Sequence, residues 1–306
     1  SADVALFVAS WETRAVNTVN RVEFECPKAI LISFEDDGLD DDEIKFSLSL
    51  LSKKFATVIH RRIPASTSRK AWSGQLENLI MELPEGGEAT TIAVDYTCLP
   101  KAISQTLFRA FIRKGSFAKS IWMYSLGKYD EGIGNLFASQ GVREFFPIRH
   151  TPGDGGLSPK RVAVVGLGND ESLVIEFLER FNFDRVVVLS ANSENSPGLR
   201  TGADRLKDRL IKEGRVHEED FFECDASSVI SAINTLYKIV ASQEPKMSVD
   251  IFLSGPKSHA IAACVVVEKF SETVRLMGRE AEQYQRNEVP AEGTISIVEV
   301  IDYTNP

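Results

Sequence analysis

Three short apolar segments recur along the chain, in the same order and at nearly the same spacing. Residues 4–8 match 162–166 at an offset of 158, and residues 29–33 match 186–190 at an offset of 157. The third match is a Pro-Lys step after an apolar run, at Pro100 and Pro256, with an offset of 156. Several matches at one spacing indicate an internal duplication.

Apolar segments alternate with helical patterns in both halves of the chain. The expected strands are 4–9, 29–34, 57–62, 90–95 and 121–124, then 162–165, 185–189, 220–224, 249–253 and 294–301. Strands that are apolar throughout and alternate with helices are typical of parallel sheets covered on both faces. We therefore expect an α/β protein with two tandem Rossmann-like parallel-sheet domains that form an internal pseudo-dimer.

Glycine and proline set the expected domain boundaries. The first unit covers 1–128 and the second 161–306. A connector at 129–160 lies between them, because its end, 151–159, is the strongest linker signal in the chain. Within the second unit, 271–293 is polar and has no counterpart in the first, so we expect a helical insert there.

Composition excludes several classes of protein. A net charge of −9 over 306 residues argues against an extended nucleic-acid surface. No apolar run is long enough to span a bilayer, and the first residues lack a secretory signal pattern. The four cysteines form no C-x-x-C pair. We expect a cytoplasmic protein with neither a membrane contact nor a cofactor.

Ligands of doubly wound sheets bind at the carboxyl ends of the strands. In the first unit, the loop after the first strand offers four candidates: Ser10, Trp11, Glu12 and Arg14. The Trp11 ring is suited to stack on a base, and Arg14 to bind a phosphate. The alternative is that Trp11 packs on the helix while Glu12 and Arg14 form an exposed pair.

The equivalent loop of the second unit holds part of a glycine fingerprint, with Gly168 and Asn169 as candidates. Backbone amides at this helix start are suited to hold an anion. The neighbouring Asp170 and Glu171 offer another interpretation, since acids at a helix start complement its dipole. A partial fingerprint gives no support for NAD binding.

The Pro-Lys turns carry the sharper signal. Lys101 and Lys257 are both expected in the first turn of a helix, where the helix dipole disfavours a cation. An anionic ligand held by the helix amides and the lysine would resolve this conflict. The alternative is a solvated lysine. The nearby candidate ligand contacts are Thr97, Ser254, Gly255, Ser258 and His259.

Two of these features have open alternatives. His259 suits a base or a phosphate contact, but equally a surface or capping residue. The acidic run 36–43 suggests a divalent metal, although its spacing does not match an EF-hand loop. Acids at a helix start, together with solvation, explain the run without a metal, so we expect no metal site.

The loops and turns together resemble those of CRISPR-associated Rossmann fold (CARF) domains and of SAVED domains from prokaryotic antiphage signalling. The resemblance rests on the turns 97–101 and 254–257 and on the loops 10–14 and 168–172. It covers most of the chain, with proline where those families have Gly-Thr. It implies a cyclic oligonucleotide lying across both units, with Lys101 and Lys257 facing it from two sides.

The resemblance implies a nucleotide-binding sensor of bacterial defence that binds a small anionic nucleotide and acts with a separate effector protein. One alternative is a nucleotide-processing enzyme at the same inter-domain cleft, such as a ring-nuclease-like phosphodiesterase or another hydrolase. A second is a scaffold subunit whose polar insert docks a partner. The residues leave all three hypotheses open.

Overall fold

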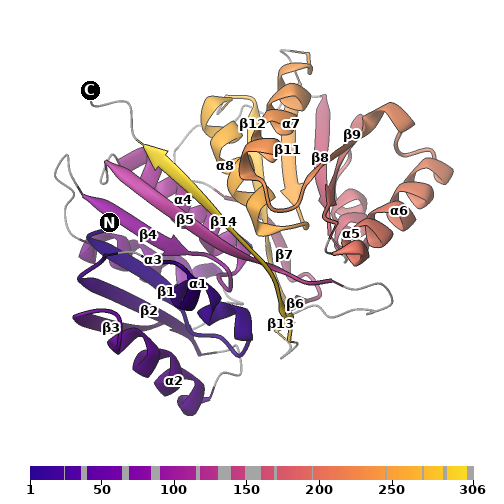
Figure 1. Cartoon of the computed structure of the whole chain (residues 1–306). Helices are drawn as coiled ribbons and strands as arrows, with labels where there is room; N and C mark the ends of the chain where they lie inside the picture. Colours follow the sequence, from indigo (N-terminus) through magenta and orange to yellow (C-terminus); the bar gives the residue numbers. More distant parts are fainter. Residues whose placement is uncertain are drawn as a thin grey trace. The chain divides into compact units, whose positions relative to one another are not determined.

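The computed structural model divides the chain into two compact units (Figure 1). Unit 1 holds Ser1–Gly127, Phe137–Gln140 and Glu280–Pro306, and unit 2 holds Lys128–Leu136 and Gly141–Arg279. The residues that the structure describes are 1–23, 25–35, 40–63, 69–83, 90–114, 118–129, 139–148, 160–168, 171–194, 196–244, 247–270, 272–284 and 288–301.

Unit 1 is built on a six-stranded sheet of order β14-β5-β4-β1-β2-β3. Its strands are β1 (Val4–Val8), β2 (Lys28–Phe34), β3 (Thr57–Ile63), β4 (Thr91–Asp95), β5 (Lys119–Gly127) and β14 (Ala291–Ile301). Its helices are η1 (Thr13–Val16), α1 (Asn17–Arg21), α2 (Asp41–Ser52), α3 (Arg69–Glu82) and α4 (Lys101–Lys114). The first five strands are parallel, and β14 joins β5 antiparallel.

Unit 2 is built on a second six-stranded sheet, of order β10-β9-β8-β11-β12-β7. Its strands are β7 (Glu144–Pro147), β8 (Arg161–Leu167), β9 (Arg185–Asn192), β10 (Phe221–Asp225), β11 (Ser248–Leu253) and β12 (Val274–Glu280). Its helices are α5 (Glu171–Arg180), α6 (Pro197–Lys212), η2 (Glu218–Asp220), α7 (Val229–Ala241) and α8 (Lys257–Lys269). A small antiparallel pair joins β6 (Ser139–Gln140) to β13 (Gln283–Tyr284).

The predicted fold class is confirmed. The order β3-β2-β1-β4-β5 in unit 1 has the same form as β10-β9-β8-β11-β12 in unit 2. The segments matched in the sequence therefore occupy equal places: β1 and β8 at the centre, β2 and β9 on one side, β4 and β11 on the other. Every residue of β1 and β11 is buried, which explains why β1 is apolar throughout and why the one charged residue of β11, Asp250, has buried partners.

The last strand lies in a different place from the one predicted. We expected 294–301 to close the second unit, but β14 pairs antiparallel with β5 of unit 1, with Ile297 opposite Met123. The register shifts between Ala291 and Ile295, where Gly293 has a positive φ of 113°. Such a φ favours glycine, and it permits the irregularity with which β14 begins.

The structure also differs from the expectation of a helical insert at 271–293, because this segment contains β12, the fifth strand of unit 2. Val274 and Leu276 are buried as strand residues should be. Arg275 contributes to the polar composition of the segment, but its guanidinium group pairs with the buried Asp250 inside unit 2. The predicted connector at 129–160 likewise contains strands, and β7 joins the sheet of unit 2, while 149–159 lies outside the described residues.

A buried carboxylate joins three neighbouring strands of unit 2. Asp250 on β11 has an exposed side-chain fraction of 1% and accepts hydrogen bonds from two arginines, Arg161 on β8 and Arg275 on β12. Arg275 binds in a bidentate manner, with Nε at 2.6 Å and Nη2 at 2.7 Å from the two carboxylate oxygens. Arg161 also lies over the ring of Phe183, at 4.8 Å from its centroid.

We predict that Asp250→Asn destabilises unit 2 by about 3–5 kcal/mol, because it leaves two largely buried guanidinium groups without their counter-charge. Urea unfolding followed by far-UV circular dichroism measures this change. The control is Glu179→Gln on the exposed side of α5, which should change stability by less than about 0.5 kcal/mol. Equal midpoints for the two variants would contradict the prediction.

Candidate functional site

Each unit has a topological switch point between its central strand and the fourth strand. β1 pairs in parallel with β4, and β8 pairs in parallel with β11. The strand order reverses at these pairs, so the following loops lead to helices on opposite faces of the sheet. Ligands of open α/β sheets bind at this place. The predicted loops and Pro-Lys turns therefore share one edge within each unit.

Both lysines begin a helix, as predicted. Lys101 is the first residue of α4, and Lys257 is the first residue of α8. Both are half-buried. Pro256 is the N-cap of α8, with φ −57° and ψ 150°, and it offers no side-chain oxygen to the helix amides. The two turns lie at matched places in the two sheets but differ in length, since five residues separate β4 from α4 and three separate β11 from α8.

In unit 2, the loops after β8 and β11 touch backbone to backbone. A Cβ atom on Gly255 would lie 2.6 Å from the carbonyl oxygen of Leu167, and one on Gly168 would lie 2.8 Å from that of Ser254. Ser254 holds the turn against β8, since its N–H and its hydroxyl donate hydrogen bonds to the Gly166 carbonyl at 3.1 and 2.7 Å. Packing therefore requires both glycines. Asn169 lies outside the described residues.

Ser258 and His259 face into unit 2. Both residues are fully buried, with 0% exposure. The Ser258 hydroxyl donates to the carbonyl of Ala226, and His259 Nε2 lies 3.1 Å from the Asp225 carbonyl oxygen. These contacts hold the start of α8 against the loop after β10. The ligand contacts predicted for the two side chains would need them to become accessible.

A thiol lies beside the buried imidazole, since Cys224 Sγ is 3.3 Å from His259 Nε2. Desolvation by burial, followed by the charge of Asp225, raises the pKa of Cys224 to about 12. A nucleophilic cysteine needs the opposite shift, because the thiolate is the reactive form. This Cys-His pair is therefore a packed contact and does not form an activated nucleophile.

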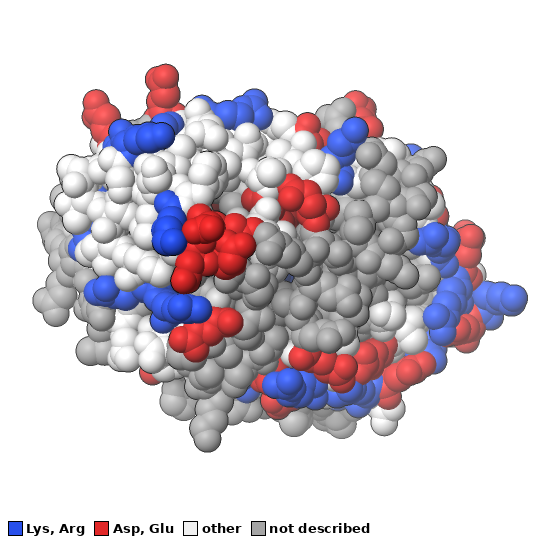
Figure 2. All heavy atoms as spheres, turned by 90° about the horizontal axis from the view of Figure 1, so that it is seen from below, with Lys and Arg blue, Asp and Glu red and all other residues white. Residues whose placement is uncertain are grey.

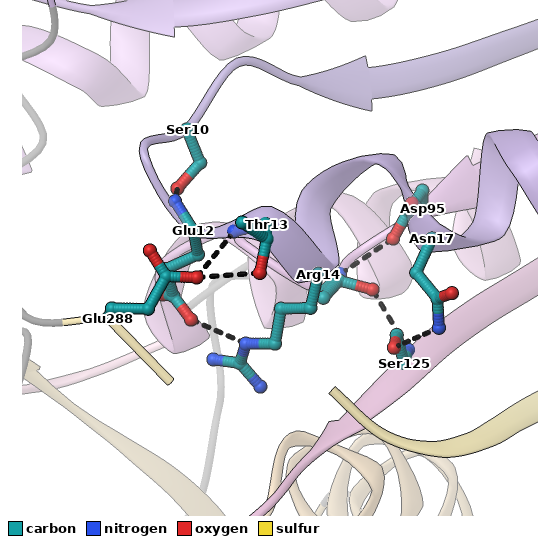
Figure 3. A network of polar contacts seen from close by, with 9 residues as sticks. Ser10, Glu12, Thr13, Arg14, Asn17, Asp95, Ser125 and Glu288 are labelled. Carbon is teal, nitrogen blue, oxygen red and sulfur yellow. Dashed lines mark hydrogen bonds and ion pairs between the residues drawn. The ribbon is translucent and has the colours of Figure 1, made fainter. Parts of the chain in front are cut away.

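In unit 1, the loop after β1 contains a buried ion pair. Arg14 Nε donates to Glu12 Oε2 at 2.5 Å, and each side chain is 6% exposed (Figure 3). The alternative interpretation of the sequence, in which Glu12 and Arg14 pair with each other, is thus correct about the partners. The pair is buried, however, whereas we expected an exposed one. Ser10 Oγ accepts from the N–H of Glu12 at 3.2 Å, and Trp11 is half-buried.

The short helical segment after this loop lies against the ends of β4 and β5. The Thr18 hydroxyl donates to Asp95. Asn17 Nδ2 donates to the Ser125 hydroxyl at 2.8 Å (Figure 3). Thr97 belongs to the same network, because its N–H donates to Asp95 at 2.9 Å and its hydroxyl accepts from the Ser125 N–H at 2.9 Å.

Sequence reasoning missed Asp95, Thr18, Asn17 and Ser125. A signal existed for Asp95, since an acid that ends an apolar strand is a candidate for a buried role. Asp95 is 3% exposed and Thr97 only 1%, so this edge of unit 1 is closed in the structure. A ligand contact of Thr97 would therefore need this edge to open.

The acidic run caps a helix in the part that the structure describes. Asp40 accepts from the N–H groups of Asp42 and Glu43 at 3.1 and 2.9 Å, and Glu43 returns a bond to the Asp40 N–H. This is a capping box at the start of α2. Residues 36–39 lie outside the described ranges. Over those ranges, no group of three or more His, Cys, Asp and Glu could hold a metal ion.

The charges on the face drawn in Figure 2 are mixed, with Lys and Arg interspersed among Asp and Glu. Such a pattern is typical of an ordinary solvated surface and differs from the continuous basic face of proteins that bind long nucleic acids. Across the described portion of the chain, no helix has both the length and the apolar character that a membrane crossing requires.

Comparisons with known proteins show no family for this chain. No protein-family model matches it, and no curated protein matches it. Among solved structures, it is similar to the cytoplasmic domain of a prokaryotic cation chloride cotransporter, at 8% identity and a TM-score of 0.28, over 93% of this chain and 98% of that one. A similarity at that level carries no argument about function.

We predict that Gly255→Ala destabilises unit 2 by about 1–3 kcal/mol, because the new methyl group meets the Leu167 carbonyl and the loops must separate. Gly74→Ala on α3 is the matched control, since a Cβ atom there meets nothing within 4 Å. Replacing a helix-interior glycine that faces open space with alanine should instead raise the free energy of unfolding by about 0.5–1 kcal/mol. Thermal unfolding of the two variants compares them, and the same sign for both would contradict the prediction.

Cys224 should resist alkylation in the native protein. With its pKa near 12, the thiol stays protonated at pH 8, and burial blocks access as well. We expect iodoacetamide to modify the half-buried Cys98 first, and Cys224 only at the rate of unfolding. Peptide mass spectrometry over time separates the two sites. Fast modification of Cys224 in the folded protein would contradict this prediction.

Proposed function

We propose that this protein is a nucleotide-binding regulatory protein, in which each unit uses its Pro-Lys turn to bind an anionic group. The observation that carries the proposal is the repetition of the turn. Lys101 and Lys257 begin helices that follow the matched strands β4 and β11, at the switch point of their own sheets.

The electrostatics of this position support an anion. Each lysine adds a cation to a helix end at which the amides already carry partial positive charge, so both groups at this place are suited to an anion. A phosphate would accept hydrogen bonds from helix amides and would neutralise the lysine at once.

The surrounding residues agree with a small ligand. In unit 2, Gly255 lets the turn lie against the loop after β8, so the start of α8 has a fixed place at the sheet edge. The mixed surface charge and the net charge of −9 favour a compact anion over a long nucleic acid. The ligand that we propose first is a cyclic dinucleotide or oligonucleotide, in line with the CARF and SAVED resemblance.

The role that we propose is that of a cytoplasmic sensor in bacterial defence, which passes the signal to a separate effector protein. Cleavage of the bound nucleotide is the second candidate, because a positioned 2′-hydroxyl and a lysine can suffice for it. The buried Cys224–His259 pair supplies no nucleophile for such a reaction, since the pKa of the thiol is raised. Product analysis by chromatography distinguishes binding from cleavage.

We predict that Lys101→Ala and Lys257→Ala each weaken nucleotide binding about tenfold or more, because each removes a charge-assisted contact to phosphate. Isothermal calorimetry against a panel of cyclic and linear nucleotides measures the affinity. Lys269→Ala is the matched control, since Lys269 lies at the other end of α8 and is exposed. The proposal fails if no nucleotide binds, or if all three variants bind as the parent does.

A further inference from the structure

The C-terminal segment of the chain returns to the loop after β1. Glu288 Oε1 accepts a hydrogen bond from the Thr13 N–H at 3.0 Å and another from the Thr13 hydroxyl at 2.6 Å (Figure 3). A few residues further on, the carbonyl of Gly293 accepts from Arg21 Nη1. The two contacts hold both ends of the helical segment 13–21, and all these residues belong to unit 1.

A second carboxylate of the same segment makes a similar contact. Glu280 Oε2 accepts from the Arg69 N–H at 3.1 Å, at the first residue of α3. Glu288 likewise meets the first residue of η1. Carboxylates are favourable at helix starts because the amides there carry partial positive charge. The segment 280–301 is therefore fastened to unit 1 by charge at its beginning and by the β14–β5 pairing along its end.

The inner side of the segment 13–21 combines polar contacts with the apolar packing of Val19, which is 2% exposed and belongs to the core of unit 1. Thr18 meets Asp95, and Asn17 meets Ser125, at the ends of β4 and β5. These contacts cover Thr97, which is 1% exposed although it follows the strand that leads to the Pro-Lys turn. The segment thus lies between solvent and the candidate site of unit 1, and its outer side is held by an exposed carboxylate.

We propose that residues 13–21 form a lid over the candidate site of unit 1 and that Glu288 is the latch that keeps it closed. Release of Glu288 frees the start of the lid while the β14–β5 pairing remains. The segment 280–301 continues directly from β12, so a change in unit 2 has a covalent route to the latch. The latch stands on the contacts alone, whereas its effect on a ligand rests on the proposed function.

Hydrogen exchange of the full chain tests the latch. Glu288→Ala should raise the exchange of amides 13–21 about three- to tenfold, because it removes two hydrogen bonds to a charged acceptor. Glu288→Gln should give a smaller increase, since the amide oxygen still accepts. Amides of α2 and α4 should be unchanged. An unchanged lid, or an equal increase throughout unit 1, would overturn the latch.

Glu299→Ala is the matched control, because Glu299 is an exposed carboxylate on the same segment. It pairs with Lys119 on β5 at 2.7 Å. We expect this variant to leave exchange at 13–21 unchanged, and a lid that opens equally in both variants would overturn the specific role of Glu288.

Nucleotide binding tests the lid. For any nucleotide of the panel that binds the parent protein, the Glu288→Ala variant should have an affinity about three- to tenfold higher. The reason is that removing the latch raises the fraction of protein with an open lid by about this factor. Glu299→Ala should bind as the parent does. Equal affinity of Glu288→Ala and the parent overturns the lid. A panel in which nothing binds overturns the proposed function, and the exchange result then decides the latch by itself.

Discussion

The parallel pairing of the central strand with the fourth strand determines the arrangement of the candidate site in each unit. β1 pairs with β4, and β8 pairs with β11, so the loops that leave these strands begin side by side. The helices that follow lie on opposite faces of the sheet, so the loops of the two strands meet at one edge. This pairing determines where the Pro-Lys turns, the loop after β1 and the loop after β8 lie.

The two units treat the same edge in different ways. In unit 2, Gly168 and Gly255 let two backbones touch, and no side chain larger than hydrogen fits at these positions. In unit 1, the edge holds side chains that bond one another, among them Asp95, Thr18 and Ser125. A duplicated topology thus carries one edge fixed by backbone contact and one closed by polar side chains.

The sequence predicted the central strands of both sheets, because strands buried on both faces are mostly apolar, but it did not predict β7 and β12. It could not predict where β14 would pair, since 291–301 has the composition of a strand but no feature that names its neighbour. Arg275 adds to the polar composition of the same region, and the sequence does not show that its partner is the buried Asp250. Glu12 and Arg14 could be predicted as a pair, but their burial could not.

The chemistry of the unit 1 edge suits a contact that opens and closes. When a buried polar pair separates, each group regains hydrogen bonds with water, so the net cost is small compared with the strength of the bonds themselves. An apolar contact of equal size would lose its burial and would recover nothing from the solvent. The hydroxyl and amide contacts of Thr18 and Asn17 are of this polar kind, whereas Val19 lies in the apolar core, so opening at the end that Glu288 holds costs less than opening at Val19.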